Sequence, residues 1–161
     1  MPIKESMKGV EDMNGSELLQ YALEREKKDQ SIYTQYARKT SSQGLVQLLH
    51  SLIDQEDVHI KELNTIAERG DIDDLFAAEK LARLDHSSFE TGSAFSPEMT
   101  TNDFLNHLIE LKESGVRFYS ALAGMCSDEE LSFTFNNLSF EEQKHKNWAM
   151  DRYELEMLSS M

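Results

Sequence analysis

The chain repeats itself: residues of its first half recur 86 positions later, without a gap in the alignment of the two halves. The repeated residues fall mainly on apolar positions three or four apart, which is the spacing of one face of a helix. This duplication predicts two helical hairpins packed about a pseudo-twofold axis, with the repeated residues facing a shared core. The matching pairs are Leu19 and Leu105, Glu24 and Glu110, Tyr33 and Tyr119, Ala37 and Ala123, Ser41 and Ser127, Leu45 and Leu131, Leu52 and Leu138, Glu56 and Glu142, and His59 and His145.

The hydrophobic periodicity predicts a single all-α domain over residues 16–161, after a flexible leader over 1–15. The repeat halves span about 16–70 and 102–158, and a crossover of about 30 residues joins them. Four long helices with one long connection predict an up-down four-helix bundle. The expected helices cover about 16–41, 45–69, 101–123 and 129–158, with a shorter one over 72–84 in the crossover.

Cap residues suggest where the helices begin and end. Ser16, Thr101 or Asn102, and Ser127 are the expected N-caps, because their short polar side chains can accept a hydrogen bond from the first turn. Gly70 is expected to stop the second helix.

Composition excludes several classes of function. The net charge of −14 argues against nucleic acid or an anionic membrane as a partner. Cys126 is the one cysteine, so this chain cannot itself form a disulfide or the paired Cys-x-x-Cys site of a rubredoxin. No run approaches the roughly 18 apolar residues of a membrane span, and no secretory signal is visible, so a cytoplasmic location is the default expectation.

Two Glu-x-x-His pairs, at Glu56 with His59 and at Glu142 with His145, lie on predicted inward faces of helices. Residues three apart share one helix face, so each pair can aim a carboxylate and an imidazole at one point. Such ligands suit a first-row metal ion. Glu26 lies on the inward line of the first helix, where a carboxylate needs a partner.

These features resemble the ferritin-like superfamily and, more closely, its small rubrerythrin-like members without a rubredoxin domain. The resemblance implies that Glu56 and Glu142 bridge two irons, that His59 and His145 ligate one each, and that Glu26 is a terminal ligand on the iron of His59. Zinc or manganese would suit the same ligands. The matching signatures are Glu26 with Tyr33, Glu56-x-x-His59, the Glu-Ser-Gly-Val-Arg-Phe-Tyr run that ends at Tyr119, and Glu142-x-x-His145.

Lys112 departs from this pattern, because it stands 86 residues after Glu26, where the resemblance implies a second terminal carboxylate. An ammonium has no lone pair to give a cation and repels one nearby. Three arrangements follow. A single ion is held by Glu26, Glu56 and His59, with or without Glu142. Alternatively, two ions bind with Glu113 or water as the substitute ligand, although Glu113 points about 100° away around the helix. In the third arrangement Lys112 forms an ion pair with Glu56 or Glu142 and the bundle is metal-free.

The resemblance implies an iron-dependent oxidoreductase that acts on peroxide or oxygen, as a peroxidase or a ferroxidase, with an external electron donor and as a homodimer. The alternative is a bundle with a structural or interaction role, since Lys112 impairs the site.

Several other side chains are given roles by their position. Tyr33 and Tyr119 are expected either to donate to the carboxylates or to be ordinary core residues. The remaining histidines lack ligand spacing and are expected to be exposed, and a group of large apolar residues is expected in the core or at an interface. These are His50, His86 and His107, and Phe133, Phe135, Phe140, Trp148 and Met150.

Overall fold

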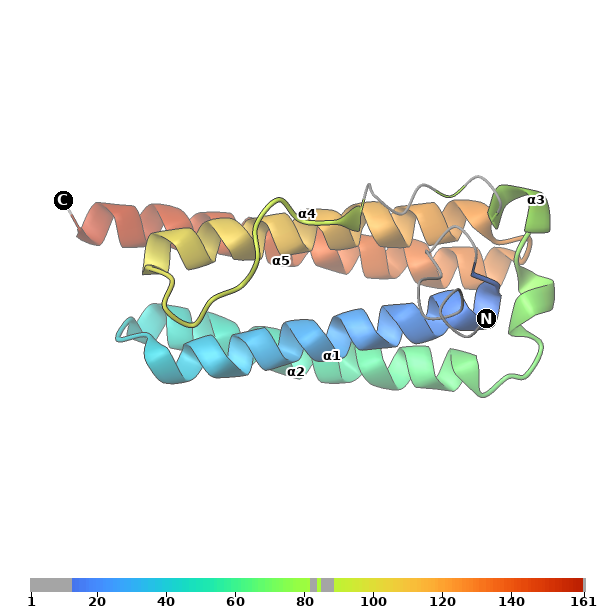
Figure 1. Cartoon of the computed structure of the whole chain (residues 1–161), viewed down its shortest axis with the longest axis horizontal. Helices are drawn as coiled ribbons and strands as arrows, with labels where there is room; N and C mark the ends of the chain where they lie inside the picture. Colours follow the sequence, from blue (N-terminus) through green and yellow to red (C-terminus); the bar gives the residue numbers. More distant parts are fainter. Residues whose placement is uncertain (1–12, 82–83, 85–88, 161) are drawn as a thin grey trace, which may run out of the picture.

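Four long helices make up the protein in a computed structural model that describes residues 13–81, 84 and 89–160. The helices lie alongside one another in one bundle, and the described residues contain no strand (Figure 1). The predicted all-α four-helix bundle with a long crossover is confirmed. The four helices are α1 (Gly15–Lys39), α2 (Gln43–Ala67), α4 (Thr101–Met125) and α5 (Glu129–Ser159).

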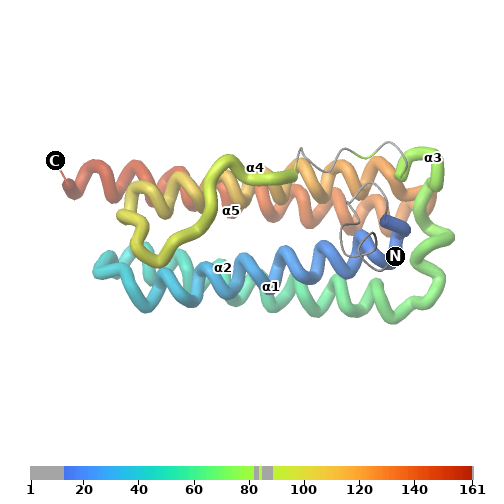
Figure 2. Tube along the Cα trace, in the orientation of Figure 1, coloured from blue at the N-terminus to red at the C-terminus, as the bar shows by residue number. Residues whose placement is uncertain are grey.

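The chain passes through the bundle as two helical hairpins. Short turns join α1 to α2 and α4 to α5, so the helices of each pair are antiparallel (Figure 2). The crossover then returns along the bundle, and α4 begins at the end where α2 begins (Figure 2). This return makes α4 antiparallel to α1, which sets the residues that the two helices bring together.

The helix N-caps differ from the predicted ones by one or two residues. Asn14 caps α1 in place of Ser16, because the Asn14 side chain accepts a hydrogen bond from the backbone of Glu17 at 2.8 Å. Thr100 caps α4 and Asp128 caps α5, one residue from the expected Thr101 and Ser127. In each case a neighbouring side chain of similar capping strength reaches the first turn.

Two further predictions concern the end of α2 and residues that the structure does not describe. Gly70 has φ +80° and follows the end of α2, as predicted, although the helix itself stops at Ala67. Residues 1–12 of the expected leader, and His86 in the crossover, lie outside the described residues.

The crossover does not contain the single helix predicted over 72–84. It has a 3₁₀ turn, η3 (Ile72–Leu75), and one helical turn, α3 (Ala78–Leu81), separated by Phe76 in an extended conformation. The interruption comes from tertiary pairing with the α4–α5 turn. The Ala77 N–H donates to the carbonyl of Met125 at 2.8 Å, and the Ser127 N–H donates to the carbonyl of Leu75 at 2.8 Å.

The apolar core is divided by a polar layer. On α1, buried Leu18 to Leu23 belong to one apolar cluster and Ile32 to Tyr36 belong to another, with Glu26 and Asp29 between them. The other three long helices pass from cluster to cluster in the same way. The bundle therefore places its buried charged groups midway along the helices, enclosed by apolar layers on both sides.

The aromatic residues of α5 split between the core and the surface. Phe135 is buried in the core, whereas Phe133 and Phe140 are 66% and 79% exposed.

The structure contains one chain, so the homodimer stays a prediction. None of the helices in the described part of the chain combines the length and the apolar run that a membrane span requires.

Phe76 explains the irregular crossover and gives a stability test. Its buried ring lies 6.1 Å from the ring of Phe135. We expect Phe76→Ala to lower the free energy of unfolding by about 3–5 kcal/mol through lost burial and the cavity left behind. Phe133→Ala removes the same atoms from an exposed position and is expected to change it by less than about 0.5 kcal/mol. Urea unfolding of both variants measures this, and equal effects would contradict the packing of Phe76.

Candidate metal centre

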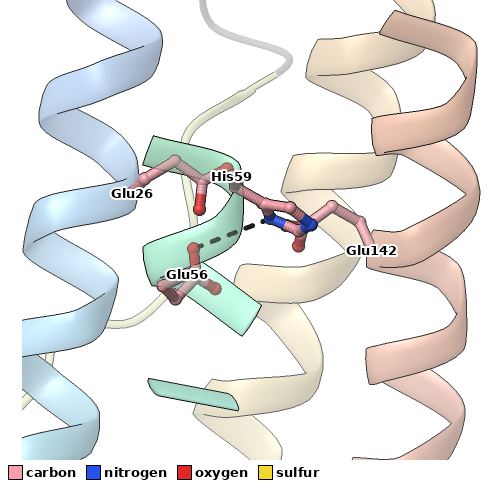
Figure 3. A group of neighbouring side chains, drawn as sticks. All are labelled: Glu26, Glu56, His59 and Glu142. Carbon is pink, nitrogen blue, oxygen red and sulfur yellow. Dashed lines mark ion pairs between the residues drawn. The ribbon is translucent and has the colours of Figure 1, made fainter. Parts of the chain in front are cut away.

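Four predicted ligand residues converge in the polar layer. Glu26 comes from α1, Glu56 and His59 from α2, and Glu142 from α5 (Figure 3). One ligand atom from each lies within 4.8 Å of the others, and all four residues are buried. Opposite ligands of a metal ion at bond lengths of about 2.1 Å are about 4.2 Å apart, so shifts of a few tenths of an ångström would close the group on one ion.

The centre of this group is His59. Its Nδ1 lies 3.9 Å from Glu26 Oε1, 4.0 Å from Glu56 Oε2 and 3.9 Å from Glu142 Oε1. These separations are longer than the donor–acceptor distance of a hydrogen bond. An imidazole surrounded by three carboxylates at this distance is the arrangement expected of ligands that face a common ion.

Unpaired polar atoms show that the four residues fit a cation. Within the described residues, Glu26 Oε2, Glu56 Oε2, Glu142 Oε1 and both ring nitrogens of His59 are buried and have no hydrogen-bond partner. Buried polar atoms without partners are costly. A metal ion bound to these oxygens and to one nitrogen would satisfy all of these atoms except the second nitrogen of His59. Three carboxylates and one imidazole suit iron, manganese or zinc.

Lys112 enters the same layer from α4 and is fully buried. Its Nζ donates to Glu56 Oε1 at 2.8 Å, lies 3.3 Å from Glu142 Oε2, and sits 5.1 Å from the centre of the Tyr33 ring. Burial disfavours the charged form of Lys112, but the charges of Glu142, Asp29 and Glu26 outweigh it and raise the pKa of Lys112 above its ordinary value. Lys112 is therefore a permanent positive charge within the layer.

The charge balance follows from these residues. With His59 neutral, the carboxylates of Glu26, Glu56 and Glu142 and the ammonium of Lys112 leave two negative charges, which one divalent cation would balance. The carboxylate of Asp29, in the same layer, adds a further negative charge when it is ionised. A second divalent cation would leave an excess of positive charge in a buried layer, at a high electrostatic cost. The layer thus suits one metal ion beside Lys112.

The pKa values of the carboxylates diverge with their surroundings. Burial raises the pKa of Glu142 to about 7, although the charge of Lys112 opposes the shift. For Glu26, burial acts upward too, but the neighbouring His59 and Lys112 outweigh it and the pKa is lowered. The Tyr119 hydroxyl also donates a short hydrogen bond to Glu26 Oε1. Glu26 is thus held as an anion, whereas burial disfavours the ionised form of Glu142.

His145, the fifth predicted ligand, is not part of the converging group. It is buried, with its ring 5.8 Å from that of His59 and 5.0 Å from that of Trp148. Its Nε2 lies 3.8 Å from Glu141 at the edge of the bundle, and neither ring nitrogen has a hydrogen-bond partner among the described residues. Burial, together with the charge of Lys112, lowers the pKa of His145 to about 3, so the ring is neutral.

Glu113, the predicted substitute ligand, faces away from the layer. Its half-exposed side chain lies 3.6 Å from Arg117 Nη1 on the same helix. The helical geometry that separates it from Lys112 by about 100° is retained.

Three buried residues had no part in the predicted site. Asp29 is buried one turn after Glu26, and burial raises its pKa to about 6. His107, expected to be exposed, is buried beneath the crossover at 3% exposure, whereas His50 is exposed as expected. Gly115 leaves space for Glu142. The position of Asp29 on the inward stripe was the sequence signal for it; no local pattern signals His107.

One comparison with known proteins finds a similarity in the first half of the chain. Residues 17–91 match the family model described as Rubrerythrin. The matched part contains Glu26, Glu56 and His59 and ends before the helices that carry Lys112 and Glu142. No curated protein and no solved structure matches the chain significantly.

Gly115 offers a test of the close packing around Glu142. A Cβ at this position would lie 2.7 Å from Glu142 Oε2, whereas a Cβ at Gly124 on the same helix meets nothing within 4 Å. We expect Gly115→Ala to lower the free energy of unfolding by about 1–3 kcal/mol through overpacking. Gly124→Ala should be neutral or stabilising by up to about 1 kcal/mol, because alanine favours a helix. Urea titrations compare the two variants; a stabilised Gly115→Ala protein would show that Glu142 does not need this space.

Proposed function

We propose, from the match of residues 17–91 to the Rubrerythrin family model, that this protein binds one iron ion and reacts with peroxide or oxygen. Glu26, Glu56, His59 and Glu142 would hold the ion. The observation that carries the proposal is the set of unpaired buried ligand atoms around His59. Lys112 supports a single ion, since its ammonium fills the side of the layer where a second ion would need a carboxylate.

The protein residues around the ion have separate tasks. Lys112 binds Glu56 Oε1 and lies beside Glu142 Oε2, so the other oxygen of each carboxylate would be available to hold the ion. Tyr119 fixes Glu26 by donating to its Oε1, which leaves Oε2 available. The apolar clusters on both sides keep bulk water away from these groups.

Bound iron would supply one-electron redox chemistry toward the oxidant. Reduction of hydrogen peroxide to two waters consumes two electrons and two protons, so a single-ion site needs an external electron donor. The one cysteine of the chain cannot provide a rubredoxin-type centre for that purpose. A ferroxidase role, in which ferrous iron itself is the reductant, uses the same ligands.

A second candidate function is a metal-free bundle with a structural role. The ion pairs of Lys112 with Glu56 and Glu142 favour it, because one ammonium contacts two of the three carboxylates and offsets one of their negative charges without a metal. The unpaired nitrogens of His59 and the unpaired oxygens of all three carboxylates weigh against it.

Metal stoichiometry distinguishes the two candidates and checks the role of Lys112. Protein exposed to ferrous iron without oxygen and then desalted should retain about one ion per chain in elemental analysis. Lys112→Glu should raise this to about two, because a carboxylate replaces the repelling ammonium. Lys112→Met is the matched control: it removes the charge without adding a ligand. Retention of fewer than about 0.2 ions per chain by the wild type would exclude the metal-binding function.

The redox role is tested separately on the iron-loaded protein. With ascorbate as the external donor, the protein should consume hydrogen peroxide, and Glu56→Gln should reduce the rate by at least about tenfold, through lost iron binding. Glu113→Gln, a change on the exposed face of α4, should leave the rate unchanged. Equal rates for the wild type and Glu56→Gln would show that the buried centre does not perform the reaction.

A further inference from the structure

The outer face of α5 carries large apolar side chains that no other part of the described structure covers. Seven large apolar side chains are exposed in the described part of the chain, and six of them belong to α5. Single exposed residues of this kind are normal on a protein surface, whereas a contiguous group marks an interaction site. Four of the six form a group that we call the α5 stripe, and each is more than half exposed. They are Phe133, Phe140, Leu155 and Leu158.

Helical geometry places the α5 stripe on the side of α5 opposite the core. At about 100° per residue, its four members lie within about 60° of one another around the helix. Phe140 stands two residues from the buried Leu138 and two from the buried Glu142, which puts it almost on the opposite side of the helix from them. Between Phe140 and Leu155 the same line carries three exposed polar residues. These are Lys144, Asn147 and Asp151.

The C-terminal part of α5 projects beyond the bundle. This helix has 31 residues, whereas α1, α2 and α4 have 25 each, and its end extends past the start of α4 (Figure 1). None of the described residues of α5 after Ala149 is buried. Leu155 and Leu158 belong to this final part, where contact with water is unfavourable for them. A second surface placed along α5 would cover these leucines, which the single chain leaves exposed.

The order of residues along the line of the stripe is self-complementary. When a twofold axis relates two copies of a helix and the helices lie antiparallel, each residue faces the one at equal distance beyond the axis. For an axis that crosses α5 between Asn147 and Trp148, Phe140 faces Leu155 of the second copy and Lys144 faces Asp151 of the second copy. Apolar groups thus meet apolar groups, and an ammonium meets a carboxylate. A parallel pair would instead place two Lys144 ammonium groups together.

Lys144 and Asp151 give the pairing its charge complementarity. Lys144 Nζ lies 3.7 Å from Glu141 Oε2 and 5.2 Å from the centre of the Trp148 ring, so contacts within α5 hold the ammonium beside the stripe. One ammonium and one carboxylate leave the line of the stripe without net charge, although the chain as a whole carries −14. Two acidic chains can therefore meet through this face, whereas an anionic membrane would repel them.

The size of the stripe suits a contact between two whole chains. From Phe133 to Leu158 it runs for about 38 Å at 1.5 Å per residue. Its four apolar side chains together expose on the order of 500 Å². A standard protein interface covers about 800 Å² on each partner, so the polar residues on the same line are needed to complete it.

We propose that the outer face of α5 is the interface of a homodimer, in which two copies of the chain pack antiparallel through the α5 stripe. The twofold axis lies near Asn147 and Trp148, and a shallow crossing of about 20° keeps the two helices in contact along the stripe. The projecting Leu158 of each copy then lies beside Asn137 of the other, one helical turn from Phe133. This inference is independent of the proposed function, because no residue of the stripe holds the ion.

The mass of the full chain in solution tests the interface. Sedimentation equilibrium at about 1–100 µM should give twice the chain mass of 18.5 kDa. Phe140→Glu places a charge against Leu155 of the second copy and should weaken the dimer by at least about 100-fold. Val58→Glu is the matched control, because Val58 is the exposed large apolar residue of the described chain that lies outside α5, and it should remain dimeric. Circular dichroism checks that both variants are folded.

Each other result of this experiment overturns the proposal. A wild type that is monomeric over the whole range has no such interface, and co-sedimentation of that monomer with phosphatidylcholine vesicles would assign the stripe to a membrane surface. A dimer that Phe140→Glu leaves unchanged would show that the subunits meet through another face.

Charge reversal tests the antiparallel orientation separately. Lys144→Glu and Asp151→Lys each place like charges together at two symmetry-related positions, and each should weaken the dimer by about tenfold at low salt. The double variant restores opposite charges and should return to within about twofold of the wild type. Lys61→Glu, an exposed change on α2, is the control and should have little effect. A double variant weaker than either single variant would overturn the antiparallel arrangement.

Discussion

The ammonium of Lys112 determines how the interior of this bundle is arranged. It lies between the carboxylates of Glu56 and Glu142 and is enclosed by four helices, where an isolated charge would be prohibitively costly. The ion pairs are favourable only because both carboxylates are held by separate helices at the correct height. The register of α2, α4 and α5 is therefore tied to one cation supplied by the protein. Any metal ion bound by this layer must accept Lys112 as its neighbour.

This cation makes the two halves of the duplicated bundle unequal. His59 is surrounded by three carboxylates, whereas His145 is turned toward Trp148 and has Glu141 as its nearest acid. The repeat provides both histidines with the same helical position, but only His59 lies among three carboxylates, one of which, Glu142, comes from the second half. Lys112, at the position where the repeat would place a counterpart of Glu26, thus makes the surroundings of the two histidines different.

Much of the fold could be predicted from the sequence, because its determinants are local. Apolar stripes gave the four helices, and the two Glu-x-x-His pairs gave inward-facing groups, three of whose members lie in the converging group. The errors occur where tertiary contacts compete with local preference. Phe76 interrupts the expected crossover helix because its ring packs on the core and its neighbours pair with the α4–α5 turn. His107 is buried because the crossover covers it, and nothing in its helical spacing signals that cover.

By itself, the sequence determined that Glu26, Glu56 and Glu142 face the interior and that Lys112 replaces a carboxylate in the repeat. Tertiary structure decided which groups Lys112 pairs with, how Tyr119 reaches Glu26, and that the crossover covers His107. The physical reason is the distance along the chain over which each determinant acts. Helical periodicity fixes the direction of a side chain within a few residues, but the distance between atoms on different helices depends on the register of the whole bundle. That register is set by packing between residues far apart in the chain.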